Sequence, residues 1–252
     1  MSRERRLDGA IVVLTRRRED NAVLAEELRQ RGAEVIELPC IRTEKLHDTG
    51  QLAEALTALE PSDLLVVTSR AGVDAIADVM PRAGIACGVA AVGEASAERA
   101  AAAGLKVRFV ASSADGATLG HELPLPRGTV VLARSDLADA DLPAALRRRG
   151  ADVRDVVAYH TVATIDGDPG SVRRALDRGP VTIVAASPSA VDALATAVGA
   201  ELLRHASFVA IGPRTAQRIR ERIGRAVVVA ANTDVDALVR AVPSPQREEA
   251  TP

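Results

Sequence analysis

The stretch FVAIGPRTAQRI, residues Phe208 to Ile219, decides how this chain folds. Its apolar start predicts a short buried strand, and Gly212 with Pro213 ends that strand and opens a helix at once. Glycine allows the backbone to approach a ligand closely, and proline suits the first helical turn because no N–H is needed there. The free amides and the positive end of such a helix bind carboxylates or phosphates. Any α/β protein has such turns, so this stretch alone does not establish a site.

Four blocks of the first half recur in the second half, in one order and at nearly one spacing. VAAVGEASAERA (89–100) lies 119 residues before FVAIGPRTAQRI, and TSRAGVDAI (68–76) lies 118 before ASPSAVDAL (186–194). The opening VLTRRRED and the segment VASSADGATL have counterparts in VLARSDLA and VAANTDVDAL at the same spacings. The repetition indicates an internal duplication.

Composition excludes several classes of protein. Of the 252 residues 47% are hydrophobic, yet only one tyrosine and two phenylalanines are present, so we expect a core of Ala, Val, Leu and Ile. Basic and acidic residues nearly balance (32 against 34), which gives no overall field to attract nucleic acid. The two cysteines and four histidines have no metal-ligand spacing, and we expect free thiols and no metal. The charged amino terminus predicts neither a signal peptide nor a membrane span, hence a cytoplasmic protein.

Strands and helices alternate along the whole chain, which predicts an α/β protein with parallel sheets covered on both faces. Cutting at the start of the repeat would give two sequential domains. We favour another arrangement: two flavodoxin-like lobes joined by a two-stranded linker of residues 39–43 and 158–163. Lobe 1 then combines residues 1–38 with 164–252, and lobe 2 is residues 44–157. The tail from about residue 243 is predicted to be disordered. A narrow hinge of this kind also makes a cleft, a usual place for a ligand.

Seven short motifs in this order resemble the uroporphyrinogen-III synthase family, over roughly Ala10 to Val242: VLTR, TSRAGV, AVGEASA, YHTV, AASPSAV, AIGPRTA and ANTDVDAL. The resemblance implies a hydro-lyase of porphyrin and heme biosynthesis. Such an enzyme cyclises hydroxymethylbilane to uroporphyrinogen III, with inversion of the terminal pyrrole ring and loss of water. It implies no cofactor, an anionic linear tetrapyrrole as the only ligand, and neither a nucleic acid nor a membrane as partner. We expect a monomer that makes at most transient contact with the preceding pathway enzyme.

The resemblance assigns the catalytic role to Tyr159, the single tyrosine, in the return segment of the linker. A phenol there can donate a proton to the departing hydroxyl. The alternative is an amphipathic side chain that fills a half-buried joint.

The remaining candidates are substrate contacts, all at strand ends or helix starts: Arg16, Thr68, Ser69, Gly93, Ser96, Arg134, Ser135, Ser187, Pro188, Ser189, Gly212, Arg214 and Thr215. Arginine suits carboxylates through its planar fork, and the alternative for each arginine is a solvated surface position. The alternative for the serines is helix capping. Ser96 stands where other members often have threonine, which preserves the hydroxyl.

Other functions fit the chain less well. It has neither a GxGxxG fingerprint nor a GxxxxGK[ST] P-loop, which disfavours a nucleotide enzyme. The rival hypothesis is a non-catalytic sensor whose two lobes close on a tetrapyrrole or another polyanion. Such a sensor would bind the bilane without changing its spontaneous cyclisation.

Overall fold

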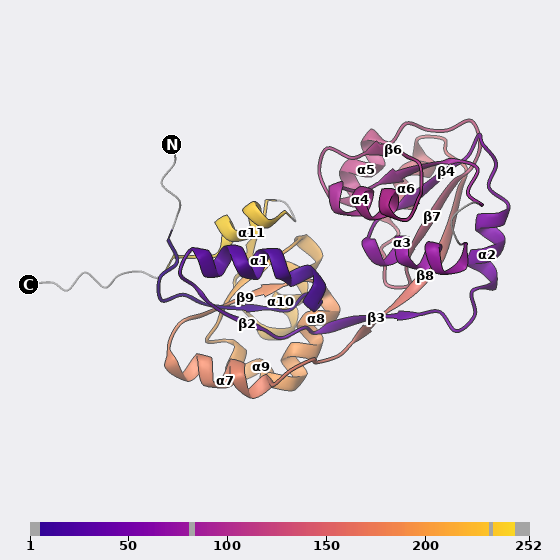
Figure 1. The fold of residues 1–252 in the computed structure, drawn as a ribbon. Helices are drawn as coiled ribbons and strands as arrows, with labels where there is room; N and C mark the ends of the chain where they lie inside the picture. Colours follow the sequence, from indigo (N-terminus) through magenta and orange to yellow (C-terminus); the bar gives the residue numbers. More distant parts are fainter. Residues whose placement is uncertain (1–5, 81–83, 232–233, 245–252) are drawn as a thin grey trace, which may run out of the picture. The chain divides into compact units, whose positions relative to one another are not determined.

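The computed structural model describes residues 6–80, 84–231 and 234–244 (Figure 1). The chain divides into two compact units, of which unit 1 comprises residues 1–42 and 162–252 and unit 2 residues 43–161. Each unit is an α/β structure built on a parallel sheet. Most of the tail predicted to be disordered lies outside the described residues.

Unit 1 holds a five-stranded sheet in the order β11-β10-β9-β1-β2. Every pairing in it is parallel, and the central strands are continuous apolar runs buried on both faces, as helix-covered parallel sheets require. Its elements are β1 (Ile11–Leu14), α1 (Arg18–Gln30), β2 (Glu34–Glu37), α7 (Pro169–Arg178), β9 (Val181–Ala185), α8 (Pro188–Leu194), a π-helical turn η1 (Ala195–Gly199), α9 (Ala200–Leu203), β10 (Ser207–Ala210), α10 (Pro213–Ile223), β11 (Val228–Val229) and α11 (Val235–Ala241).

Two apolar clusters cover the two faces of this sheet. α1 and α11 pack on one face, where Leu24, Leu28 and Leu238 are fully or almost fully buried. α7, α8, α9 and α10 pack on the other, around Phe208 and Ile219 (Figure 1). The core is aliphatic, as the composition predicts.

Unit 2 holds a six-stranded sheet in the order β3-β8-β7-β4-β5-β6. The pairings from β8 to β6 are parallel. Its elements are β3 (Ile41–Lys45), α2 (Gly50–Thr57), β4 (Leu64–Val67), α3 (Arg70–Val79), β5 (Gly88–Ala91), α4 (Glu94–Ala102), β6 (Val107–Val110), α5 (Gly116–Glu122), β7 (Val130–Ser135), α6 (Asp141–Arg148) and β8 (Val153–Ala163). α2, α3 and α4 cover one face, and α5 and α6 cover the other.

The chain passes between the units through β3 and the end of β8, which are neighbours in the sheet. Beyond them the two segments remain hydrogen-bonded, since Thr164 N–H donates to the Cys40 carbonyl (3.0 Å) and Asp166 N–H to that of Pro39 (2.9 Å). Contacts group residues 39–42 with unit 1 and 158–161 with unit 2. The physical reason is burial: Cys40 lies in the core of unit 1, and Tyr159 packs against that of unit 2.

The two units carry one ion pair at corresponding positions. In unit 2 Arg99 of α4 binds Asp74 of α3 (2.5 Å), and in unit 1 Arg218 of α10 binds Asp192 of α8 (2.8 Å). These residues are equivalents in the sequence repeat. The pairs connect the same two helices in each unit.

Two further features concern the helices and the surface. The sequence pattern predicts one helix over 190–198, but it ends as α8 at Leu194 and continues as the π-helical turn, where Gly199 has a φ of 106°. No helix within the described ranges is long and apolar enough to cross a membrane.

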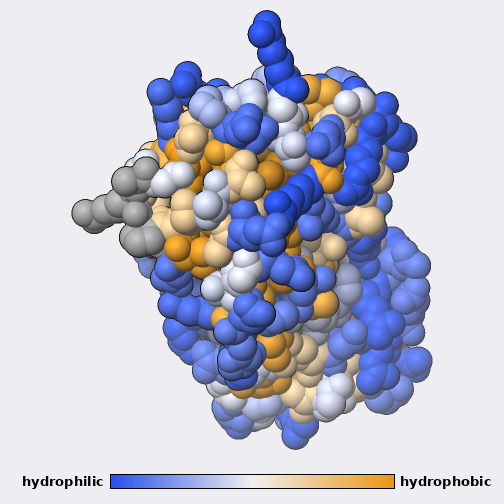
Figure 2. Space-filling view, turned by 90° about the vertical axis from the view of Figure 1, so that its right-hand side faces the viewer, coloured by the Kyte–Doolittle hydropathy of each residue, from blue (hydrophilic) through white to orange (hydrophobic). Residues whose placement is uncertain are grey.

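The face in Figure 2 mixes charged and polar residues with apolar ones, and the exposed large apolar side chains include Val23 and Leu137.

Candidate active site

The candidate residues lie at or near the carboxyl ends of the parallel strands, in the last residues of strands, in the loops that follow and in the first turns of helices. In open α/β sheets ligands bind at this end, where strands stop and helices begin. Ser69 follows β4 and Gly93 follows β5 in unit 2, while Ser187 follows β9 and Gly212 follows β10 in unit 1. Each unit therefore presents one serine loop and one glycine loop.

In unit 2 the serine loop meets the single tyrosine. Ser69 is the N-cap of α3, and its Oγ accepts the Gly72 N–H at 3.0 Å. The same Oγ lies 2.9 Å from the phenol oxygen of Tyr159, in β8. Both side chains are half-buried, as is Thr68, which precedes the cap. Ser69 and Tyr159 belong to separate motifs of the sequence, and the sheet order brings them together.

A second polar cluster in unit 2 surrounds Asp136, just past β7. Its carboxylate accepts the Thr161 N–H (2.9 Å) and the Ser135 hydroxyl (3.0 Å) and contacts His160 Nδ1 (3.0 Å). Burial opposes the negative charge, but the hydrogen bonds from His160, Thr161 and Ser135 prevail and lower the pKa of Asp136. Ser135 also contacts the Thr161 hydroxyl at 2.7 Å. Of this cluster only Ser135 is among the candidates from the sequence, because no local motif links Asp136 to His160 and Thr161 of the YHTV segment.

In unit 1 the serine loop has the same cap without a phenol. Ser187 Oγ accepts the Ala190 N–H at 3.1 Å and lies 3.0 Å from Ser189 Oγ. Pro188 is exposed at the first position of α8, where its missing N–H costs nothing. The hydroxyls of Ser187 and Ser189 therefore lie close together at the first turn of α8.

The two glycine loops differ in the space around them. Both glycines are extended N-caps (φ −177° and −172°), a conformation open to any residue, and neither helix has a side-chain cap. A Cβ at Gly93 would meet the Cβ of Ala114 at 2.7 Å, so glycine is required there by close packing. A Cβ at Gly212 would meet nothing within 4 Å. The start of α10 therefore has room beside Gly212, and the positive end of a helix favours an anionic group.

Three candidates lie at buried positions and do not fit the role predicted for them. The Arg134 side chain is 7% exposed and bound to Asp155 through Nε (3.0 Å) and Nη2, while Nη1 donates to the Asp139 carbonyl (2.8 Å). Ser96 and Thr215 are 6% and 3% exposed on the inner sides of α4 and α10. We assign all three to the framework of the loops, because little of their surface can reach a ligand.

The two remaining arginines lie in the loops of unit 1. Arg16 is half-buried just past β1, and its carbonyl accepts the Asn21 side-chain amide at 3.0 Å. Beside it the Thr15 hydroxyl joins β1 to β9, donating to the Val184 carbonyl (3.0 Å) and accepting the Ala186 N–H (3.1 Å). Arg214 is exposed in the first turn of α10. Both arginines are on the side of unit 1 that carries the serine and glycine loops.

The placement of the two cysteines and of the possible metal-ligating side chains bears on thiol and metal chemistry. Among the described residues no three or more His, Cys, Asp or Glu side chains gather where they could hold a metal ion. Cys40 and Cys87 are unpaired and buried, one in each unit. Burial raises the pKa of Cys40 to about 12 and also raises that of Cys87, so both remain neutral thiols at pH 7.

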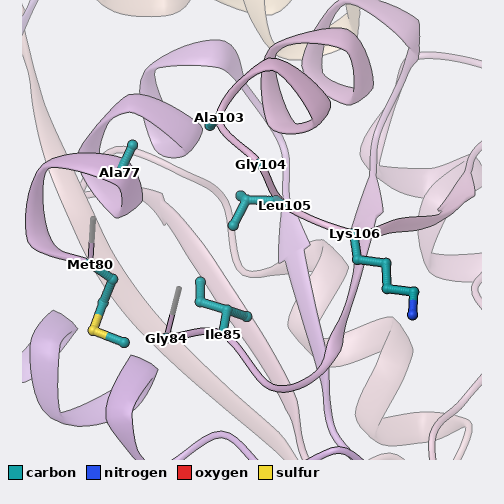
Figure 3. A pocket seen from close by; sticks show the side chains of 8 residues that line it. All are labelled: Ala77, Met80, Gly84, Ile85, Ala103, Gly104, Leu105 and Lys106. Carbon is teal, nitrogen blue, oxygen red and sulfur yellow. The ribbon is translucent and has the colours of Figure 1, made fainter. Parts of the chain in front are cut away.

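A small pocket in unit 2 lies away from these loops. It has a volume of about 170 Å³ and is lined by Ala77, Met80, Gly84, Ile85, Ala103, Gly104, Leu105 and Lys106 (Figure 3). It adjoins the carboxyl end of α3 and the segments that lead into β5 and β6, at the opposite end of the strands from Ser69. Its volume is below the roughly 300 Å³ at which ligand pockets begin. We therefore place the candidate site at the loops and not in this pocket.

Comparison with known proteins identifies the family. The sequence model of "Uroporphyrinogen-III synthase HemD" matches residues 22–240. A uroporphyrinogen-III synthase of Synechococcus elongatus is 26% identical over 95% of this chain and 96% of its own. The chloroplastic uroporphyrinogen-III synthase of Oryza sativa subsp. japonica is 33% identical over 72% of this chain and 63% of its own.

A solved structure shares the fold. A crystal structure of a mutant uroporphyrinogen III synthase from the extreme thermophile Thermus thermophilus superposes with a TM-score of 0.55, at 23% identity, over 92% of this chain and 96% of that one. The family match extends from α1 to α11 and so includes the serine and glycine loops of both units. This chain therefore belongs to the uroporphyrinogen-III synthase family.

Proposed function

We propose that the protein is a hydro-lyase that cyclises hydroxymethylbilane to uroporphyrinogen III, inverting the terminal pyrrole ring and releasing water. The observation that carries this proposal is the family match over residues 22–240. The relatives named as synthases favour an enzyme over the non-catalytic sensor considered from the sequence.

The loops suit an anionic and flexible substrate. Each pyrrole of hydroxymethylbilane carries an acetate and a propionate, and carboxylates bind at helix amino ends through backbone N–H groups. We assign this role to the starts of α8 and α10, with Ser187, Ser189 and Gly212, and to Gly93 and Thr68 in unit 2. Arg16 and Arg214 add positive charge to unit 1. Scattered donors of this kind hold carboxylates while the chain bends into a ring.

Tyr159 serves as proton donor in the first step. The pyrrole nitrogen next to the hydroxymethyl group pushes electrons toward the carbon as the C–O bond breaks. The oxygen takes the phenol proton and departs as water, which leaves an azafulvenium cation. Loss of the pyrrole N–H proton, to the phenolate or to water, then gives the neutral azafulvene. Because the nitrogen already assists departure, a general acid contributes about 10- to 100-fold, at or below the low end of its usual range. Most of the catalysis then comes from positioning the bilane. Ring closure without inversion of the terminal pyrrole competes with ring closure with inversion, so the enzyme must hold the chain in the right shape.

We further infer that the two units are duplicated lobes of a monomeric cytoplasmic enzyme, joined through residues 39–43 and 158–163. The matching ion pairs Asp74–Arg99 and Asp192–Arg218 support a common origin of the lobes. The paired backbone at Cys40 and Thr164 supports the linker.

The isomer of the product tests the proposed function. Purified protein, treated with chelator and incubated briefly with hydroxymethylbilane, should yield the III isomer on chromatography, whereas a blank without protein yields the uninverted I isomer. Exclusive I isomer from the wild-type protein would refute the proposed function. Binding without faster consumption of the bilane would indicate a sensor.

A further inference from the structure

Either hydroxyl could donate in the contact between Ser69 and Tyr159, and the helix cap favours one direction. The Ser69 oxygen already accepts the Gly72 N–H at 3.0 Å, and the phenol oxygen lies 2.9 Å from it. Accepting a hydrogen bond polarises a hydroxyl and makes it a better donor. The positive end of α3 acts in the same sense. This favours a chain in which Gly72 donates to Ser69 and Ser69 donates to the phenol oxygen.

In this series of hydrogen bonds the phenol does not donate its proton to Ser69. A phenol has one proton to donate and two lone pairs, and here one lone pair is occupied by Ser69. The proton of Tyr159 must then turn to another acceptor. Tyr159 is half-buried, so part of its side chain is open to solvent. In this arrangement the phenol proton is left for an acceptor other than Ser69.

Gly72 provides the room for this arrangement. A Cβ at residue 72 would lie 3.0 Å from the Ala133 carbonyl oxygen, 3.4 Å from Ser69 Oγ and 3.8 Å from Cε1 of Tyr159. The distance to the Ala133 carbonyl oxygen is shorter than an ordinary contact, and a shift of the β7 backbone would disturb its pairing in the sheet. An alanine would therefore push the first turn of α3 away from β7 and β8. The Ser69–Tyr159 contact would lengthen.

The sequence repeat supplies a natural comparison. The equivalent of Gly72 is Ala190, and the residue 118 positions before Tyr159 is Ile41. Ser187 keeps the same cap on Ala190, but its oxygen pairs with Ser189. The serine cap thus exists in both units, whereas the glycine and the phenol occur together in unit 2 alone. The cap does not require a glycine, and at residue 72 the close approach of the Ala133 carbonyl oxygen does.

We propose that Ser69 is a positioning residue for Tyr159, donating to the phenol oxygen so that the phenol proton faces the substrate, and that Gly72 makes this contact possible. The proposal rests on the proposed function for the identity of the substrate, but the contact itself can be tested without turnover.

The first test observes the phenol directly. Because Tyr159 is the only tyrosine, labelling with 3-fluorotyrosine places 19F next to one phenol oxygen in the whole chain. Ser69→Ala and Gly72→Ala should each shift the 19F signal of the free protein. Ser69→Thr should keep the wild-type shift, and Ser187→Ala, which removes the matched cap in unit 1, should leave it unchanged. An unchanged signal in Ser69→Ala would overturn the contact.

The second test separates positioning from direct substrate binding. Ser69→Ala should slow turnover about 10-fold, and Tyr159→Phe at least as much. The double variant should be no slower than Tyr159→Phe, because Ser69 acts only through the phenol. For Ser187→Ala and Tyr159→Phe, by contrast, the fold-losses in turnover should multiply in the double variant. Multiplying effects of Ser69→Ala and Tyr159→Phe would overturn the positioning role.

The two proposals fail in different ways. If the wild-type protein forms only the I isomer, the proposed function is wrong while the 19F result still decides the contact. If Gly72→Ala does not fold, Ser69→Ala and its rescue by Ser69→Thr carry the test alone. A III-isomer product with multiplying effects would leave the enzyme standing and remove Ser69 from its positioning role.

Discussion

Removal of Arg134 should destabilise unit 2 alone. Its buried guanidinium makes two contacts with Asp155 and one with the Asp139 carbonyl. Deleting one partner of a buried pair costs about 3–5 kcal/mol, and because the Asp155 side chain is 33% exposed and can be hydrated, we expect about 3 kcal/mol for Arg134→Met. The predicted role in substrate binding would give a different result, a higher KM with unchanged stability.

The two buried cysteines make the assay specific for each unit. Cys40 reports on unit 1 and Cys87 on unit 2, and neither reacts until its surroundings open. When opening is fast relative to labelling, the labelling rate follows the population of the open form. A loss of about 3 kcal/mol should accelerate alkylation of Cys87 roughly 150-fold and leave Cys40 unchanged. Peptide mass spectrometry after a timed pulse of a thiol reagent measures both rates in one sample.

The matched control is Arg148→Met, an exposed arginine on α6 of the same unit, which should change neither rate more than about two-fold. An unchanged Cys87 rate in Arg134→Met would refute the assignment of Arg134 to the framework. Equal acceleration at Cys40 and Cys87 would refute the independent opening of the units.

Three further outcomes are expected. Tyr159→Phe should slow turnover about 10- to 100-fold with the III isomer unchanged on chromatography, and complete loss of activity in a folded variant would show that proton transfer matters more than positioning. Gly212→Leu should raise KM in initial-rate assays with melting unchanged, because its side chain would enter open space at the start of α10; an unchanged KM would remove this loop from the site. Asp136→Asn should lower stability by about 1 kcal/mol at pH 7. Because the folded pKa of Asp136 lies below its ordinary 3.8, that difference should disappear in urea titrations as pH falls through the folded pKa, and a difference that persists in acid would contradict the charge-based explanation.

Local signals in the sequence were sufficient for the elements and their junctions. Ser69 and Ser187 stand where apolar runs meet helical spacing, and both are N-caps in the structure. The aliphatic core and the α/β class also follow from the sequence, because parallel strands buried on both faces must be continuous apolar runs. The family motifs rest on the same local junctions. The origin of the two units by duplication and the linker bounds 39–43 and 158–163 stay predictions from the repeat.

Tertiary structure decided which polar side chains are available for chemistry. Arginine near a strand end suggests a carboxylate ligand, but the register of β7 with β8 pairs Asp155 with Leu132. Asp155, 21 residues after Arg134, is therefore a diagonal neighbour that binds its guanidinium. The rotation of α4 and α10 about their axes buried Ser96 and Thr215. Ser69 and Tyr159 are 90 residues apart, and only the order β8-β7-β4 brings them within 2.9 Å. Caps and turns depend on neighbours a few residues away, which a sequence contains directly, whereas burial and long-range partners depend on how the sheet is ordered and where its helices face.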